Sequence, residues 1–180
     1  YDARLENTGW DAPNYDDSQW KKPKVYTYPN GKLEAYPGTQ VKNTEILKPI
    51  AMTEPSPGTY VFDLGKNIAG IAELKVQGPK GTKVQLRFGE ILKNDGQIQT
   101  ENLRKARATD TYILKGEGLE VWKPKFTYHG FQYVEVTGFP GKPTLETITG
   151  HVLSSIETNA STFGSSNAMN NTLFENIKTT

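Results

Sequence analysis

Residues 125–140 form the most strongly β-patterned run of the chain, KFTYHGFQYVEVTGFP. Aromatic residues alternate with polar ones up to Gly130, and a second alternation follows it. This second alternation predicts two faces, one with Phe131, Tyr133 and Glu135 and the other with Gln132, Val134 and Val136. Apolar residues on both faces are typical of a central strand that is covered on both sides. Gly130 is the expected position of a bulge that bends this strand.

Shorter apolar runs on either side predict the partners of this strand. We expect strands at residues 60–64, 72–76, 84–88, 109–114 and 144–154. Glycine-rich and Asn-Asp-Gly turn signals separate several of these runs. The pattern therefore predicts an all-β fold, an antiparallel β-sandwich over residues 58–154. Its buried core is expected to include Phe62, Leu74, Val84, Leu86, Phe88, Val134 and Val136.

The residues before this block are polar and irregular. Residues 39–57 are expected to be a connector with one short strand, because prolines interrupt it. In residues 1–38, Trp10 and Trp20 lie among Gly, Pro and Asp residues. Aromatic faces can stack on sugar rings, so these two side chains are candidates for a sugar platform. The interpretation we favour is structural, with both tryptophans anchoring a loop that has little other core.

The pattern changes to a helical period near the C-terminus. Met169, Leu173 and Ile177 recur at helical spacing within residues 165–178, and Phe174 lies beside them. We expect one amphipathic helix, capped by a serine at position 165 or 166. A helix this short needs tertiary packing to persist, so at least Leu173 and Phe174 should contact apolar partners.

Composition narrows the function classes. The net charge is +1, which gives no support for a nucleic-acid or anionic-membrane partner. Cysteine is absent, which excludes disulfides, thiol catalysis and cysteine metal sites. No apolar run is long enough to span a bilayer. The first residue is Tyr1, so we expect the chain to be part of a longer protein, and its localisation stays open.

No catalytic constellation stands out among the residues that could carry one. The acids associated with the expected strands are Asp63, Glu73, Glu90, Glu101, Asp110 and Glu135. Their spacing does not specify a pair that could act as general acid and general base. His129 has no suggested nucleophile partner, so we expect a hydrogen-bonded structural role for it.

Several long segments together carry a family resemblance. They are YDARLENTGWDAPNYDDSQW, FDLGKNIAGIAELKVQGPKGTKVQLRFGEIL, TENLRKARATDTYILKG, WKPKFTYHGFQYVEVTGFPG and FGSSNAMNNTLFENI, in this order. The chain closely resembles bacterial α-L-rhamnosidases of glycoside hydrolase family 78 over essentially its whole length. The combination of these segments and their spacing is more specific than any one of them.

The resemblance implies a domain layout. Residues 1–38 would be the tail of an N-terminal accessory jelly-roll domain, and residues 39–57 a connector. Residues 58–154 would be a β-sandwich of the concanavalin-like or jelly-roll type. Residues 155–180 would be a linker and the first helix of an (α/α)6 catalytic domain that lies beyond the chain.

The resemblance also implies a function for the parent protein, which would hydrolyse terminal α-L-rhamnose from glycosides with inversion. The catalytic carboxylates of the family lie in the helical domain, so we expect none in this chain. The expected partners are that helical barrel of the same parent chain and a rhamnosyl glycoside substrate.

Two other functions stay open. One is a rhamnose-binding module, for which Asp2, Trp10 and Trp20 are the candidate substrate-binding residues. Calcium is expected only in that case, and otherwise no cofactor. The other is an independent protein-interaction sandwich.

Overall fold

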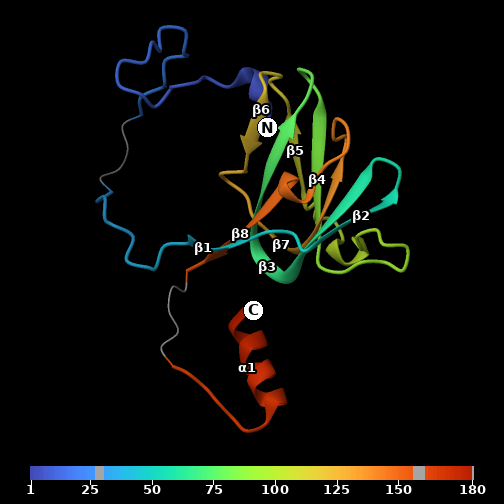
Figure 1. The fold of residues 1–180 in the computed structure, drawn as a ribbon. Helices are drawn as coiled ribbons and strands as arrows, with labels where there is room; N and C mark the ends of the chain where they lie inside the picture. The colour runs from blue at the N-terminus through green and yellow to red at the C-terminus, as the bar shows by residue number, and fades with distance from the viewer. Residues whose placement is uncertain (27–30, 156–160, 180) are drawn as a thin grey trace.

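The computed structural model of the protein describes residues 1–26, 31–155 and 161–179 (Figure 1). The long elements are β1 (Lys42–Leu47), β2 (Ala51–Ser56), β3 (Thr59–Gln77), β4 (Lys83–Gly89), β5 (Thr109–Ile113), β6 (Leu119–Trp122), β7 (His129–Thr137), β8 (Ile148–Ser154) and α1 (Ala168–Thr179). Three short 3-10 helices accompany them: Ala3–Leu5, Glu101–Leu103 and Leu145–Thr147. The all-β antiparallel fold with one C-terminal helix is confirmed.

The strands form one hydrogen-bonded sheet of eight strands that curls on itself (Figure 1). Its main order is β1-β8-β3-β7-β4-β5, and β2 and β6 also pair with β3. All these pairs are antiparallel. Strand β3 contacts four strands because its first half pairs with β2 and β7 and its second half with β8 and β6.

Strand β3 replaces the two separate strands predicted at residues 60–64 and 72–76. It runs for 19 residues, and its register against β7 shifts between Asp63 and Ile68. Gly65 adopts a φ of 77° at this shift, and its N–H donates to Asp63 Oδ1 over 2.7 Å. The predicted stop at Gly65 is therefore a local irregularity after which the strand continues.

Strand β7 is central, as predicted, but it begins at His129 and not at Lys125. Gly130 pairs regularly with Ala69, so the predicted bulge at Gly130 is wrong. The alternation breaks between Phe131 and Val134. Phe131 pairs with buried Ile68, and Val134, three positions later, pairs with buried Phe62. Phe131 thus shares the core face with Val134, contrary to the predicted two faces.

The predicted core is confirmed in full. Every residue named for it has a relative exposure of 0%: Phe62, Leu74, Val84, Leu86, Phe88, Val134 and Val136. The same cluster also contains Tyr60, Leu64, Ile68, Tyr112, Leu114, Phe131 and Ile148. These side chains fill the interior of the curled sheet, and their burial from water is the main stabilising contribution to the fold.

The segment at residues 39–57 contains two strands where one was predicted. Strand β1 pairs with β8 at the edge of the sheet, and β2 pairs with the first half of β3. A proline interrupts the regular strand pairing, as expected. Pro55 lies between Thr53 and Ser56, where the register of β2 against β3 shifts. Edge strands tolerate such interruptions because one side of the strand needs no ladder.

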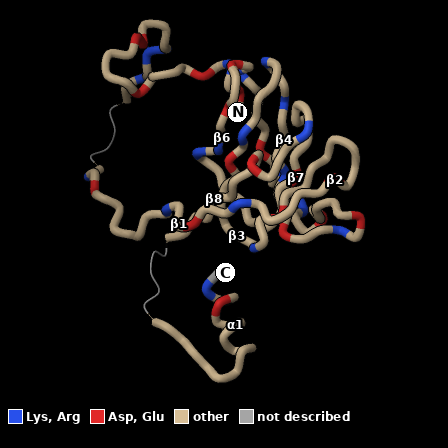
Figure 2. Tube along the Cα trace, in the orientation of Figure 1, with Lys and Arg blue, Asp and Glu red and all other residues tan. Residues whose placement is uncertain are grey.

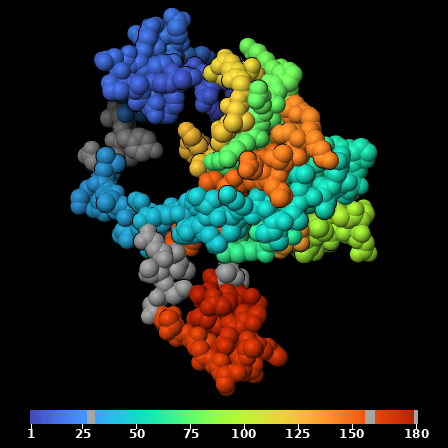
Figure 3. Space-filling model, viewed as in Figure 1, coloured from blue at the N-terminus to red at the C-terminus, as the bar shows by residue number. Residues whose placement is uncertain are grey.

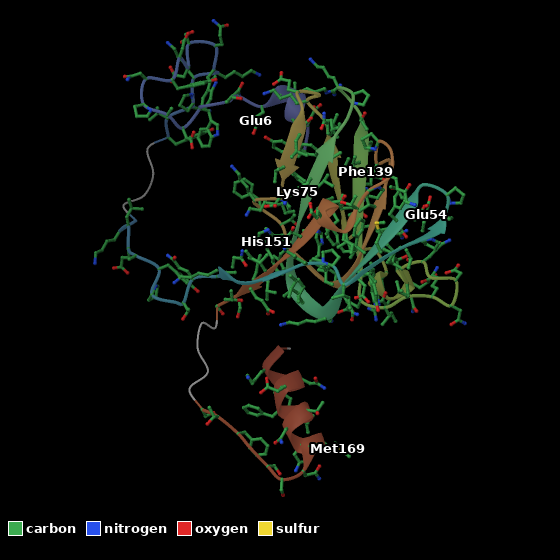
Figure 4. All side chains as sticks on the ribbon, in the orientation of Figure 1. Glu6, Glu54, Lys75, Phe139, His151 and Met169 are labelled. Atoms are coloured by element: carbon green, nitrogen blue, oxygen red, sulfur yellow. The ribbon has the colours of Figure 1, made fainter. Side chains whose placement is uncertain are left out.

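Helix α1 forms where predicted, but its cap and its packing differ. Asn167 caps it, since its Oδ1 accepts from the Met169 N–H over 3.0 Å. Phe174 packs on Phe163, with ring centroids 5.3 Å apart. This confirms the predicted apolar contact of Phe174, whereas Leu173 is 56% exposed and its predicted contact stays a prediction; Met169 points away from the sheet (Figure 4). Residues 156–160 of the predicted linker lie outside the described residues.

The charged residues are distributed along the whole molecule. Lys and Arg alternate with Asp and Glu over the tube, and neither sign gathers on one face of the view (Figure 2). Within the described residues, no helix is long and apolar enough to cross a membrane.

Candidate functional site

An aromatic groove lies between the N-terminal segment and one end of the sheet. It has a volume of about 990 Å³ and is lined from three separate parts of the chain. These parts are the first turn of the N-terminal segment with Trp10 and Trp20, the start of β5, and residues 121–127. In Figure 3 the N-terminal residues, in blue, lie beside the yellow residues around β6. We refer to this feature as the aromatic groove.

The first residues of the chain attach the N-terminal segment to the sheet. The Tyr1 amino group donates to the Thr111 carbonyl over 2.6 Å, and the Ile113 N–H donates to the Tyr1 carbonyl over 2.9 Å. The Tyr1 ring stacks on Tyr112 and Trp122, at centroid distances of 6.0 and 5.9 Å. Tyr1 therefore pairs with β5 at the outer edge of the sheet and lines the groove.

Four aromatic side chains of the groove are open to solvent, and one of them is Tyr1, which is 54% exposed. Trp10 is 58% exposed, Trp20 is 46% exposed and Phe126 is fully exposed. The favoured interpretation, in which both tryptophans anchor a loop, is supported for Trp20, whose ring lies 5.6 Å from the Tyr15 ring, although neither tryptophan is buried. The structure brings both tryptophans together with Trp122 and Phe126. Their role in sugar binding stays a prediction.

Asp2, the third predicted site residue, does not line the groove. Its carboxylate accepts from Arg4 Nε over 2.8 Å and from the Arg4 terminal nitrogen over 2.6 Å. This hydrogen-bonded ion pair lowers the pKa of Asp2 to about 2. Both oxygens are thus engaged in stabilising the first 3-10 turn, which Asp2 also caps.

Asp110 lies on the β5 side of the groove. Its Oδ1 is 3.1 Å from His129 Nε2, and its Oδ2 is buried without a hydrogen-bond partner among the described residues. The His129 ring stacks on Phe88 at 4.2 Å. The predicted hydrogen bond of His129 is confirmed, and its structural role stays a prediction.

Three of the other candidate acids have hydrogen-bond or ion-pair partners. Asp63 accepts from Gln132 Nε2, Glu90 accepts from Asn67 Nδ2, and Glu101 pairs with Lys93 Nζ. The Lys93 contact lowers the pKa of Glu101 to about 2. Among the described residues, no group of three or more His, Cys, Asp or Glu side chains could hold a metal ion.

His151 forms a second buried polar cluster, on strand β8 (Figure 4). Asn43 Nδ2 lies 2.7 Å from His151 Nδ1, which assigns the neutral tautomer with its proton on Nε2. Nε2 lies 3.5 Å from Glu73 Oε2, and Lys123 Nζ lies 3.9 Å from the same oxygen. Burial, and secondarily the charge of Lys123, lower the pKa of His151.

This arrangement predicts a loss of stability in mild acid. The unfolded chain binds a proton at His151 below about pH 6.5, whereas the folded chain resists it, so the free energy of unfolding should fall as pH drops from 7.5 to 5.5. Urea denaturation at the two pH values measures the change. His151→Gln keeps a polar side chain and should flatten the slope, and an unchanged slope in this variant would contradict the assignment.

The family comparison decides what kind of protein this is. The model described as "Bacterial alpha-L-rhamnosidase concanavalin-like domain" matches residues 53–154, and the model "Alpha-L-rhamnosidase N-terminal domain" matches residues 1–45. The chain belongs to the bacterial α-L-rhamnosidase family. The resemblance stated from the sequence is thereby confirmed, and the sandwich is the concanavalin-like domain of this family.

Individual relatives agree with the family assignment. The α-L-rhamnosidase of Streptomyces avermitilis is 48% identical over 156 residues, which are 85% of this chain and 15% of the relative. A crystal structure of the S. avermitilis enzyme complexed with L-rhamnose superposes with a TM-score of 0.86 at 43% identity, over 99% of this chain and 18% of that one. The native enzyme of Aspergillus terreus gives a TM-score of 0.89 at 34% identity, over 99% and 21%. This chain therefore spans less than a quarter of the length of each of these relatives.

Proposed function

We propose that the chain is the non-catalytic β-sandwich portion of an α-L-rhamnosidase, and that it supports and orients the catalytic domain of the same parent protein. The single observation that carries this proposal is the match of residues 53–154 to the concanavalin-like domain of the family. The parent would hydrolyse terminal α-L-rhamnose from glycosides. A rhamnosyl glycoside is thus the proposed substrate of the parent.

The proposed domain layout follows the family. Residues 1–38 are assigned to the end of the accessory domain, residues 39–57 to the connector and residues 58–154 to the sandwich. The match of the N-terminal family model to residues 1–45 supports the first assignment. Residues 155–180 are assigned to a linker and the first helix of the helical catalytic domain.

The exposed face of α1 supports a helical partner. Met169, Leu173 and Ile177 are 75%, 56% and 66% exposed, and they lie on one stripe of the helix. The sandwich does not cover this stripe, whereas the end of the helix approaches the bend of β3, where Glu175 and Asn176 line a cavity with residues 65–69. The stripe is the surface that we assign to the helical barrel.

The acids of the chain support a non-catalytic role. An inverting glycosidase needs a general acid and a general base about 6.5–9.5 Å apart with room for a water between them. Here Asp63, Glu90 and Asp110 are each hydrogen-bonded to a neighbouring side chain of the sheet. Their geometry suits the stabilisation of strands better than proton transfer.

Activity of the purified chain tests this proposal. We expect no release of 4-nitrophenol from 4-nitrophenyl α-L-rhamnopyranoside above the rate in buffer, because we assign the general acid and general base to the helical catalytic domain of the parent. Turnover that is lost on Asp63→Asn or Asp110→Asn would assign catalysis to this chain and overturn the proposal.

A rhamnose-binding module is the second candidate function, and the aromatic groove is the observation that favours it. Trp10 and Trp20 line the groove with exposed rings, while Asp2 is held by Arg4. Calcium stays linked to this alternative alone.

A further inference from the structure

We infer that the aromatic groove is a binding site for a neutral oligosaccharide, formed jointly by the N-terminal segment and the sandwich. The inference rests on the second candidate function and deepens it, because it makes the sandwich part of the site and gives the chemical class of the ligand. It rests on residues that neither segment supplies alone, namely Trp10 and Trp20 on one side and Trp122 and Phe126 on the other.

The first observation is the convergence of aromatic rings. The chain has three tryptophans, and all three line this one groove, although they are separated by up to 112 positions (10 to 122) in the sequence. Phe126 adds a fully exposed ring. Large aromatic side chains that stay open to solvent offer flat apolar faces to a ligand. The C–H faces of a pyranose ring are flat and apolar, so they can stack on such rings.

The second observation is the charge of the lining. Its acidic residues are Glu6 and Asp110, and its basic residues are Lys123 and Lys125. The charges of these side chains balance, and the Tyr1 amino group is engaged by the Thr111 carbonyl, which favours a ligand without net charge over an anion or a cation. Asp110 is further engaged by His129, and Lys123 lies 3.9 Å from Glu73.

The third observation is the set of neutral polar groups between the rings. Asn7, Thr109, Thr111 and Thr127 line the groove and carry amide or hydroxyl groups that can donate and accept hydrogen bonds. Sugar hydroxyls need such partners when they leave water. The volume of about 990 Å³ lies at the upper end of the range for small-molecule sites, about 300–1,000 Å³, so it offers room for more than one sugar ring.

Titration of the intrinsic fluorescence tests the inference, because every tryptophan of the chain lies at the groove. The probes are methyl α-L-rhamnopyranoside and the neutral oligosaccharide cellotetraose. At least one of them should change the emission in a saturable way, with a Kd of about 1 mM, which corresponds to about 4 kcal/mol. The choice of the rhamnoside rests on the proposed function and the choice of cellotetraose does not, so failure of one proposal is distinguishable from failure of the other.

Two matched variants show whether the groove carries the binding. Phe126→Ala removes an exposed ring that lines the groove and should weaken binding about three- to tenfold. Tyr128→Ala removes a ring that is 70% exposed but does not line the groove, and it should leave the affinity unchanged. Both positions lie before β7, so neither change threatens the core.

Two results would overturn the inference. One is the absence of a saturable response to either probe at 20 mM or more, about twentyfold above the expected Kd. The other is self-association of the chain in sedimentation experiments that Phe126→Ala abolishes, because a second copy of the chain would then be the occupant of the groove.

Discussion

Val134→Asp is expected to destabilise the protein strongly at 25 °C. Val134 is fully buried in the central strand β7, and it pairs with Phe62 on one side and Phe88 on the other. A carboxylate at this position would lie unpaired among aromatic rings, where it must lose its hydration or take up a proton. The expected cost is about 4 kcal/mol or more, a large fraction of the stability of an ordinary domain. Urea denaturation followed by circular dichroism measures it.

The same chemical change on an exposed strand position is the control. Val121 lies in β6 and is 54% exposed, so Val121→Asp should cost less than about 1 kcal/mol. Similar losses of stability in the two variants would contradict the position of the core between β3, β7 and β4.

Gly70→Ala is expected to separate β3 from β8. Gly70 pairs with both His129 of β7 and Val152 of β8. A Cβ atom added at Gly70 would lie 2.2 Å from the His151 carbonyl oxygen, which belongs to the backbone and cannot rotate away. The strands must therefore move apart, at an expected cost of about 2–3 kcal/mol. Thermal unfolding should show a decrease of roughly 4–12 °C in Tm.

Gly130→Ala provides the matched comparison on the neighbouring strand. A Cβ atom at Gly130 would meet only Glu90 Oε1, at 3.8 Å, which is ordinary contact. The free energy of unfolding of this variant should differ from that of the unchanged chain by less than about 1 kcal/mol. Loss of backbone freedom in the unfolded chain can even stabilise the variant. A loss in Gly130→Ala as large as that in Gly70→Ala would show that the close approach at β8 is not the cause.

The core of the fold was predictable because alternation reports burial directly. The run of Val84, Leu86 and Phe88 has the period of a strand with one buried face, and the structure buries all three. The continuity of β3 was not predictable in this way. Residues 64–67 break its alternation, and Gly65 resembles a strand end, while the partner strands that hold it together come from distant parts of the sequence.

The aromatic groove was only partly predictable. The composition around Trp10 and Trp20 indicated a loop with two candidate rings, but it carried no information about what faces them. Trp122 and Phe126 complete the groove, whereas the aromatic alternation at Phe126 predicts a strand there. The signal that could have found them is that all tryptophans of the chain lie outside the predicted core.

The C-terminal helix shows a different limit. Its 3.6-residue period was enough to predict the helix, whereas the partner of its apolar stripe depends on residues that no local pattern names. The ring that packs on Phe174 is that of Phe163, which lies before the helix and which no local pattern indicates as a partner. Leu173 is left exposed by the sandwich, as is Met169.

The most direct test of the central claim compares this chain with the longer α-L-rhamnosidase to which we assign it. Both are purified and assayed at equal molar concentration on 4-nitrophenyl α-L-rhamnopyranoside, and the anomer of the released sugar is followed by NMR. The account predicts hydrolysis with inversion by the longer protein and none by the 180-residue chain. Hydrolysis by the chain alone, or a longer protein inactive on α-L-rhamnosides, would contradict it.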